Sequence, residues 1–277
     1  MANATTWQLK KGCDRRVKAL HPWVFSNEIA SPLKALSPGA PVALFDNNNQ
    51  FVAYGYGNPN SNISFRALTY EPFNGTMQDL IYHKVLLAWR KRAHLGLKNS
   101  FRMCFSENDY LSGLIIDLYS VEQNGKHAQV LAIQISSYGI EKAIREDLKE
   151  FCKRVVEAAH KEGLTQTQWS HTCVVLRNDV NARKLEGLEV EPPQIIKELE
   201  YLDLKKIDIR LTTSQDNQYL LMQTDLIEGQ KTGFFLDQTR NIELLLTQLK
   251  KKHAFQPIQK LKVLDLCCYV GHWSTQI

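Results

Sequence analysis

Apolar and polar positions alternate near the N-terminus in a way that predicts a small β-rich unit. Two apolar runs at 41–46 and 51–57 are separated by asparagines at 47–49, which tolerate the left-handed backbone of a tight turn. They predict a β-hairpin, and a further strand is expected at 63–68. The segment 15–25 has the spacing of a short helix. Together these segments predict a β-barrel-like unit.

The middle of the chain alternates between helical and strand patterns. Apolar residues at helical spacing predict an amphipathic helix over 77–95. A second β-hairpin is expected from strands at 114–119 and 130–135, because an Asn-Gly pair lies between them. The remaining elements of this part are a helix over 140–159 and a strand over 173–177. This β-β-α-β order is typical of an α+β layer.

The C-terminal third returns to strands and ends in a pattern that opens a different fold. Strands at 207–211 and 218–223 are expected to pair, and a leucine-rich helix is expected over 242–251. The final apolar run at 262–268 contains Asp265 and leads into a glycine turn. Such a strand opens doubly wound α/β domains, whose ligands bind at the carboxyl ends of the strands. The sequence therefore predicts a multidomain α+β protein, divided as 1–74, 75–190 and 191–277.

Composition predicts a location and argues against two kinds of small domain. No apolar run approaches the ~18 residues of a membrane span, and residues 1–7 lack the basic and apolar regions of a signal peptide. We therefore expect a cytoplasmic protein that does not enter a membrane. The six cysteines include no Cys-x-x-Cys pair, which argues against a zinc module and a disulfide framework. No metal site is expected, and the thiols are expected to be reduced and mostly buried.

Basic residues are concentrated in two clusters, although the net charge of +5 is small. The first cluster comprises Lys10, Lys11, Arg15, Arg16 and Lys18, and it is followed by His21 and Trp23. Basic side chains beside aromatic rings can bind phosphates and stack on bases, so this cluster is a candidate RNA-binding surface. The alternative is an ordinary solvated helix face. The second cluster, 250–253, falls at the end of a predicted helix, where cations interact favourably with the helix dipole.

The segment 228–238 has the composition of a ligand-binding loop. Its two glycines allow the backbone to approach a ligand closely, and Phe234 and Phe235 offer an apolar wall. Asp237 and Gln238 place polar groups at the start of the following helix. The alternative is a plain loop in which Asp237 caps that helix.

Five motifs occur in an order that is characteristic of one known family. They are His21-Pro22-Trp23-Val24-Phe25-Ser26, Glu107-Asn108-Asp109 with Gly113-Leu114-Ile115-Ile116-Asp117, Arg183-Lys184-Leu185-Glu186-Gly187-Leu188, the segment 229–238, and the segment 263–271. Through them the chain resembles, over essentially its whole length, the large-subunit ribosomal RNA cytosine-C5 methyltransferases of the RlmI type.

The resemblance implies a domain order, a cofactor and a partner. It implies an N-terminal PUA RNA-binding domain, a central α+β domain and a C-terminal class I methyltransferase domain that uses S-adenosylmethionine. The implied partner is large-subunit ribosomal RNA, and a homodimer is a further possibility. The expected RNA-binding residues are Lys11, Arg15, Arg16, Lys18, His21, Trp23 and Arg66. The expected cofactor-binding residues are Phe235, Asp237, Gln238, Asp265, Cys268, Tyr269 and Gly271.

The resemblance also places the reacting cysteine outside this sequence. C5 methylation of cytosine requires a thiolate that adds to C6 of the base, and in this family that cysteine follows the glycine loop. Catalytic residues are therefore expected beyond Ile277, and the chain is interpreted as a fragment or shortened form that transfers no methyl group alone. Cys267 and Cys268 are expected to be structural, at the end of a buried strand. His272 stands where the family has a second glycine, and its side chain is expected to narrow the loop.

Two other functions are consistent with parts of the sequence. The chain could be a non-catalytic RNA-binding protein that uses its PUA-like unit, and a coding sequence that stops at Ile277 would favour this alternative. A nicotinamide-dependent dehydrogenase is disfavoured, because the segment 268–273 lacks the Gly-x-Gly-x-x-Gly spacing that binds a pyrophosphate.

Overall fold

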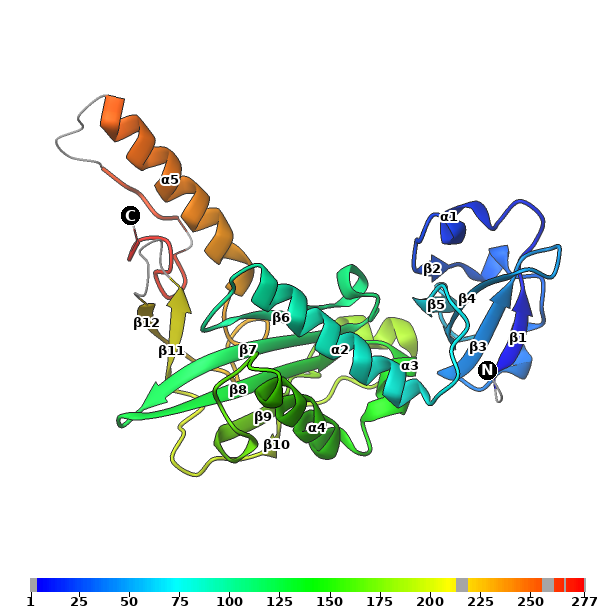
Figure 1. Cartoon of the computed structure of the whole chain (residues 1–277), viewed down its shortest axis with the longest axis horizontal. Coiled ribbons are helices and arrows are strands. Elements are labelled where there is room, and N and C mark those ends of the chain that lie inside the picture. The colour runs from blue at the N-terminus through cyan, green and yellow to red at the C-terminus, as the bar shows by residue number, and fades with distance from the viewer. Residues whose placement is uncertain (1–3, 213–218, 256–261, 267, 277) are drawn as a thin grey trace.

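Two β-sheets organise the protein in the computed structural model, which describes residues 4–212, 219–255, 262–266 and 268–276 (Figure 1). The first sheet belongs to the N-terminal unit. The second is larger, carries helices on one face, and includes strands from the middle and C-terminal parts of the chain. The predicted α+β class is confirmed.

The first sheet contains five strands in the order β1-β3-β4-β5-β2. Their bounds are β1 Thr5–Gln8, β2 Trp23–Val24, β3 Ala40–Phe45, β4 Phe51–Gly57 and β5 Phe65–Thr69, and the helix α1 spans Arg15–Lys18. The predicted hairpin is confirmed as β3 and β4. Asp46 fixes its turn by accepting hydrogen bonds from the backbone N–H groups of Asn48 and Gln50, each at 2.9 Å. In strand order the sheet is open rather than a closed barrel, although a bridge between Leu9 and Ile29 joins the segments that follow β1 and β2.

The second sheet has the strand order β10-β9-β8-β7-β11-β12, and β6 also pairs with β7. The bounds of its strands are β6 Phe101–Phe105, β7 Leu114–Gln123, β8 Lys126–Ile135, β9 Thr172–Leu176, β10 Gln194–Lys197, β11 Ile207–Thr212 and β12 Tyr219–Thr224. The predicted hairpins are confirmed as β7–β8 and β11–β12, whereas Gln218 lies outside the described residues. This one sheet includes strands on both sides of the boundary expected at 190–191, and the domain division remains a prediction.

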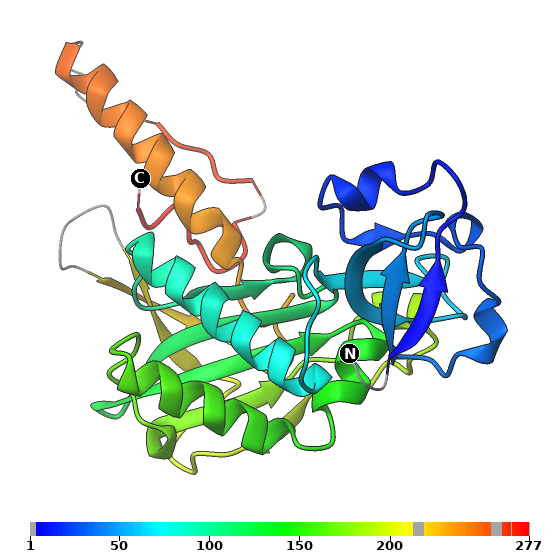
Figure 2. The same cartoon turned by 45° about the vertical axis from the view of Figure 1, so that its right-hand side comes forward.

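Helices cover one face of the second sheet (Figure 2). They are α2 Met77–His94, α3 Tyr138–Ile144 and α4 Leu148–Lys161. Alternate residues of β8 pack on opposite faces, with Leu131 and Ile133 in the cluster beneath the helices, and Val130 and Ala132 in the cluster beneath β11 and β12. Burial on both faces explains why β8 reads as a nearly continuous apolar run.

One predicted helix, 140–159, is divided into two, so the single-helix prediction is wrong. The break falls at 145–147, between α3 and α4. Asp147 occupies the position before α4, and its carbonyl accepts the backbone N–H of Phe151 at 2.8 Å. Aspartate favours helix starts over helix interiors because it competes for nearby backbone groups. Arg145 meanwhile pairs with Glu191 at 3.3 Å, which ties the break to a distant segment.

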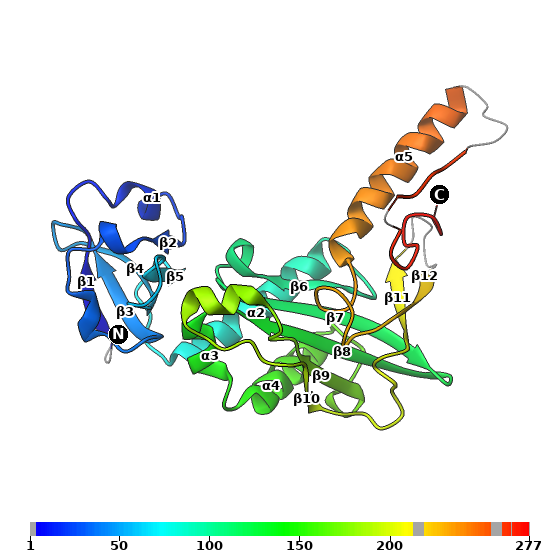
Figure 3. The same ribbon diagram turned by 180° about the vertical axis from the view of Figure 1, so that it is seen from behind.

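Buried polar contacts join the N-terminal unit to the second sheet. The Tyr56 hydroxyl lies 2.8 Å from both the Ser112 carbonyl and the Ser137 hydroxyl. Gly139 packs against the Tyr56 ring so closely that a Cβ there would lie 2.1 Å from a ring carbon. Glu186 ends the short helix η5, Asn181–Glu186, which Figure 3 shows in yellow-green beside the N-terminal unit. These contacts fix how the two units meet.

The last part of the chain departs most from expectation. Helix α5, Thr239–Phe255, projects away from the sheets (Figures 1 and 3). The expected strand at 262–268 is not formed in the described residues of that segment, where Leu264 and Leu266 are 81% and 76% exposed. A buried parallel strand is stabilised by neighbouring strands, and no described strand pairs with this segment. The strand prediction is therefore wrong, while the residues 268–276 form successive turns beside β12.

Candidate functional site

A buried arginine holds the start of the glycine-containing segment 228–238. Arg177, which follows β9, is 2% exposed and pairs with Asp179 at 3.0 Å. Its guanidinium also donates to the carbonyls of Leu226, at 3.0 Å, and Gly229, at 2.7 Å. Gly233 has a φ of +123°, and a Cβ there would lie 2.5 Å from the Leu226 side chain. The path of the segment therefore depends on Arg177, which the sequence analysis did not identify, and on the glycine at position 233.

A chain of hydrogen bonds attaches the same segment to β7. Burial and the neighbouring Asp117 carboxylate raise the pKa of Tyr119 well above its ordinary value, so its hydroxyl stays protonated. That hydroxyl lies 2.8 Å from the Thr232 hydroxyl, which in turn donates to Asp117 at 2.5 Å. Arg102 pairs with the Asp117 carboxylate at 2.8 Å. Thr232 is thus fixed by a charged pair on the central sheet.

The segment 228–238 and the C-terminal turns line an open cavity of about 700 Å³. Four of the expected cofactor residues line it, namely Phe235, Gln238, Cys268 and Tyr269. The rings of Phe235 and Tyr269 meet edge to face at 5.4 Å, and the Tyr269 hydroxyl donates to the Gly233 carbonyl at 3.2 Å. Two segments more than thirty residues apart in the sequence therefore form one aromatic-walled cavity.

His272 also lines this cavity and has an unusual environment. Its side chain is 5% exposed, and neither ring nitrogen has a hydrogen-bond partner among the described residues. The ring packs against Phe234 at 4.9 Å. Desolvation lowers its pKa to about 4, so the imidazole is neutral near pH 7. A buried polar group without a partner is costly, and a bound ligand could satisfy it. The sequence had drawn attention to His272 because it stands where the RlmI-type family has a glycine.

Three expected cofactor residues do not line the cavity. Asp237 pairs with Lys231 at 2.9 Å on the surface. Asp265 accepts a hydrogen bond from the Ser274 hydroxyl at 2.5 Å and follows no strand. Gly271 lies in the turns with a φ of +81°. Cofactor roles for these three residues remain predictions.

The first basic cluster is only partly free of protein partners. Lys11 and Arg15 are exposed and have no side-chain partner among the described residues. Arg16 instead pairs with Glu28 at 3.2 Å and lies over the Phe25 ring at 5.0 Å. Lys18 pairs with Asp14 at 2.6 Å and with Asp46 at 2.7 Å. Lys11 and Arg15 are therefore the cluster members most available to phosphate.

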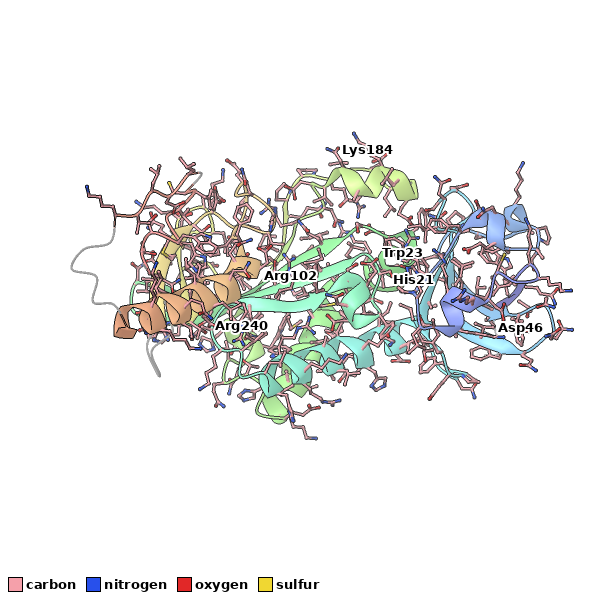
Figure 4. All side chains as sticks on the ribbon, turned by 90° about the horizontal axis from the view of Figure 1, so that it is seen from above. His21, Trp23, Asp46, Arg102, Lys184 and Arg240 are labelled. Carbon is pink, nitrogen blue, oxygen red and sulfur yellow. The ribbon has the colours of Figure 1, made fainter. Side chains whose placement is uncertain are left out.

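His21 and Trp23 lie where the N-terminal unit faces the second sheet, as Figure 4 shows. Their rings meet edge to face at 5.8 Å, and the Trp23 indole N–H donates to Glu107 at 3.1 Å. Arg66 does not reach the surface: its side chain is 9% exposed and pairs with Glu186 at 2.6 Å. Its observed contact is structural, and RNA binding by the other residues remains a prediction.

Comparisons with known proteins support both parts of this arrangement. A family model described as a PUA-like domain matches residues 8–70. Two solved methyltransferase structures match 88% of this chain, one from Streptococcus mutans, provisionally described as SAM-dependent, and one determined with SAH. Their TM-scores are 0.57 and 0.60, at 13% and 12% identity, and the match covers 54% and 53% of those chains. The chain thus carries an N-terminal PUA-like domain and shares its fold, over most of its length, with about half of each of these two structures.

Curated relatives confirm the resemblance to the RlmI-type family. Ribosomal RNA large subunit methyltransferase I of Photobacterium profundum is 26% identical over an alignment of 280 positions, which covers 96% of this chain and 58% of the relative. A protein of Methanocaldococcus jannaschii, provisionally named a ribosomal RNA large subunit methyltransferase, is 29% identical over 237 residues, 85% of this chain and 49% of the relative. The chain spans about half the length of the curated relatives it matches. No described helix has the length and apolar character needed to cross a bilayer.

Proposed function

We propose that this chain acts in the S-adenosylmethionine-dependent methylation of large-subunit ribosomal RNA, at C5 of a cytosine. The observation that carries the proposal is the cavity between the segment 228–238 and the C-terminal turns. It is lined by residues of two motifs that the chain shares with the RlmI-type family, and it lies in a chain whose N-terminal unit is PUA-like.

The residues of this cavity fit the proposed cofactor. A volume of about 700 Å³ falls within the range of ~300–1,000 Å³ that small-molecule sites occupy. Phe235 and Tyr269 would contact the apolar and aromatic parts of S-adenosylmethionine, while Gln230 and Gln238 offer hydrogen bonds. The neutral His272 ring would gain a partner. When bound, S-adenosylmethionine supplies an electrophilic methyl group.

Three cysteines are excluded as the nucleophile by their burial. Desolvation raises the pKa of Cys104 well above its usual value, that of Cys152 to about 12 and that of Cys173 to about 11. These groups are thiols near pH 7, whereas attack on C6 requires a thiolate. Cys268 differs, because it is exposed and lines the cavity. The expectation that Cys268 is buried is therefore wrong, since the strand expected to bury it is not formed; Cys267 lies outside the described residues.

The test is calorimetric titration of the chain with S-adenosylhomocysteine and S-adenosylmethionine. We expect binding, and we expect Tyr269→Ala to weaken it about tenfold or more, because the variant removes one aromatic wall of the cavity. Tyr219→Ala is the matched control: Tyr219 is 44% exposed and Tyr269 is 43% exposed, but Tyr219 lies on β12 and does not line the cavity. Absence of binding to the folded wild-type chain would overturn the cofactor part of the proposal.

The RNA and assembly parts of the proposal have separate measurements. Binding of large-subunit ribosomal RNA fragments can be followed by gel shift, and a folded chain that binds none of them would contradict an RNA substrate. Light scattering after size exclusion would test the homodimer that the sequence analysis left open, which a monomer at all concentrations would contradict.

A further inference from the structure

A second cavity lies where the N-terminal unit meets the second sheet. It measures about 490 Å³, and both units contribute to its wall. The N-terminal unit supplies Trp23 and Phe25, and the rest of the chain supplies Glu107, Ser137 and Leu185. In Figure 4 Trp23 lies at this junction, and Lys184, next to Leu185, points outward at the edge of the molecule.

The charges inside this cavity are unevenly compensated. Arg66 and Glu186 also line it, but they neutralise each other in a buried pair at 2.6 Å. Glu107 has no cationic partner among the described residues. One of its carboxylate oxygens accepts the Trp23 indole N–H at 3.1 Å, and the other has no partner there. The cavity therefore offers a hydrogen-bond donor an unused, negatively charged acceptor.

The apolar walls suit a flat aromatic ligand. Trp23 and Phe25 are half-buried, and Leu185 at the rim is 77% exposed, although it is a large apolar side chain. An exposed apolar side chain beside aromatic rings gains most when a ring covers it. A phosphate would not enter, because Glu107 would repel it, whereas the exposed Arg15 of α1 is available to phosphates outside.

We propose that this cavity binds one unpaired nucleobase of RNA and that Glu107 selects a base with an exocyclic amino group. The inference rests on the proposed function, in that it takes RNA as the ligand of this chain. Cytosine, adenine and guanine can each donate an amino hydrogen to the free oxygen of Glu107. Uracil has no amino group: its one donor on that edge, N3–H, lies between the O2 and O4 carbonyls, which a carboxylate repels, and O4 stands where cytosine has its amino group.

The test compares two fluorescein-labelled single-stranded nonamers, one of cytidine and one of uridine, by fluorescence anisotropy at pH 7.5 with the full chain. We expect the wild-type chain to bind the cytidine nonamer about tenfold more tightly, in line with the discrimination that one specific base contact provides. Glu107→Gln should bring the ratio of the two affinities close to one, because a glutamine amide can donate to the uracil carbonyl. The same amide can still accept the Trp23 indole N–H.

Glu157→Gln is the matched control. Glu157 is exposed on α4, outside the cavity, and its replacement makes the same change in charge. It should leave the affinity ratio at the wild-type value, so that the ratio separates base selection from net charge. Thermal unfolding would confirm that both variants fold.

The possible outcomes separate this inference from the function on which it rests. If the wild-type chain binds both nonamers equally, or if Glu107→Gln leaves its preference unchanged, the nucleobase cavity is refuted and RNA binding stands. If the folded chain binds no RNA at all, including ribosomal fragments, the RNA part of the proposed function fails as well.

Discussion

Replacing Glu186 should destabilise the protein far more than replacing a surface glutamate whose ion pair is equally short. The Glu186 side chain is 3% exposed and pairs with Arg66, itself 9% exposed, at 2.6 Å. It also accepts hydrogen bonds from the Ser61 hydroxyl at 2.6 Å and the Asn58 amide at 3.1 Å. Glu186→Ala removes these three contacts, together with a longer one from the Tyr138 backbone N–H at 3.5 Å, and leaves a buried guanidinium without a counter-charge.

The magnitude follows from burial. Removing one partner of a buried ion pair costs about 3–5 kcal/mol, because the remaining charge stays desolvated. For a chain of this size each kcal/mol lowers the melting temperature by roughly 2–4 °C, so the expected loss is roughly 6–20 °C. The control is Glu162→Ala. Glu162 pairs with Arg90 at 2.7 Å, but the two side chains are 34% and 49% exposed, and such pairs contribute about 0–1 kcal/mol.

The assay is calorimetric or fluorescence-monitored thermal unfolding of the wild-type chain and both variants. Glu186→Gln should fall between the wild type and Glu186→Ala: Ser61 and Asn58 donate to different oxygens of Glu186, so the single carbonyl oxygen of glutamine keeps one of these two contacts while Arg66 loses its counter-charge. Equal losses for Glu186→Ala and Glu162→Ala would refute the argument that this buried cluster holds the N-terminal unit against the second sheet.

Three further predictions concern the C-terminal cavity and the first basic cluster. Burial lowers the pKa of His272 from 6.5 to about 4. Between these two pH values the imidazole is protonated in the unfolded chain and neutral in the folded chain. The free energy of unfolding should therefore fall as the pH drops from about 6.5 to 4. In His272→Leu this part of the pH dependence should disappear from urea titrations, and an unchanged slope would contradict the burial of a neutral ring. Ellman's reagent should modify Cys268 rapidly and Cys104, Cys152 and Cys173 only on unfolding, so Cys268→Ser should remove a fast phase; an unaltered fast phase would exclude Cys268 as its source. Lys11→Ala and Arg15→Ala should each weaken RNA binding and reduce the slope of log affinity against log salt by about one. Lys18→Ala should have a smaller effect, because Lys18 already pairs with Asp14 and Asp46. The opposite ranking in salt titrations would argue against RNA binding at this surface.

Local sequence signals predicted the elements that depend on local physics. The Asn-Gly pair between β7 and β8, the asparagines between β3 and β4, and the helical spacing of α2 each specify an element within a short stretch of chain. The short strands β1, β6 and β10 were not predicted. They form by pairing with β3, β7 and β9, and such pairing is set by the tertiary fold rather than by the strand itself.

The same distinction applies to the candidate sites. The glycines and paired phenylalanines of 228–238 indicated a ligand loop, and the cavity contains four of the seven expected cofactor residues. Asp265 was favoured because an apolar run suggested a strand, but a strand requires partners that a single segment cannot show. Arg66 was expected to bind RNA, but its guanidinium is buried against Glu186, which lies 120 residues away in the sequence, a pairing that no local pattern indicates.

The contact between Tyr56 and Gly139 has a consequence for substrate selection. There a ring packs directly on a backbone without room for a methyl group, and the Tyr56 hydroxyl bonds to Ser112 and Ser137, so the N-terminal unit is attached to the second sheet by packing as well as by its linker. The distance from the exposed Lys11 and Arg15 of the N-terminal unit to the cavity beside β12 is then set by the fold. Under the proposed function, an RNA that reaches both places would be selected by the distance between its two contacted segments, as well as by its bases.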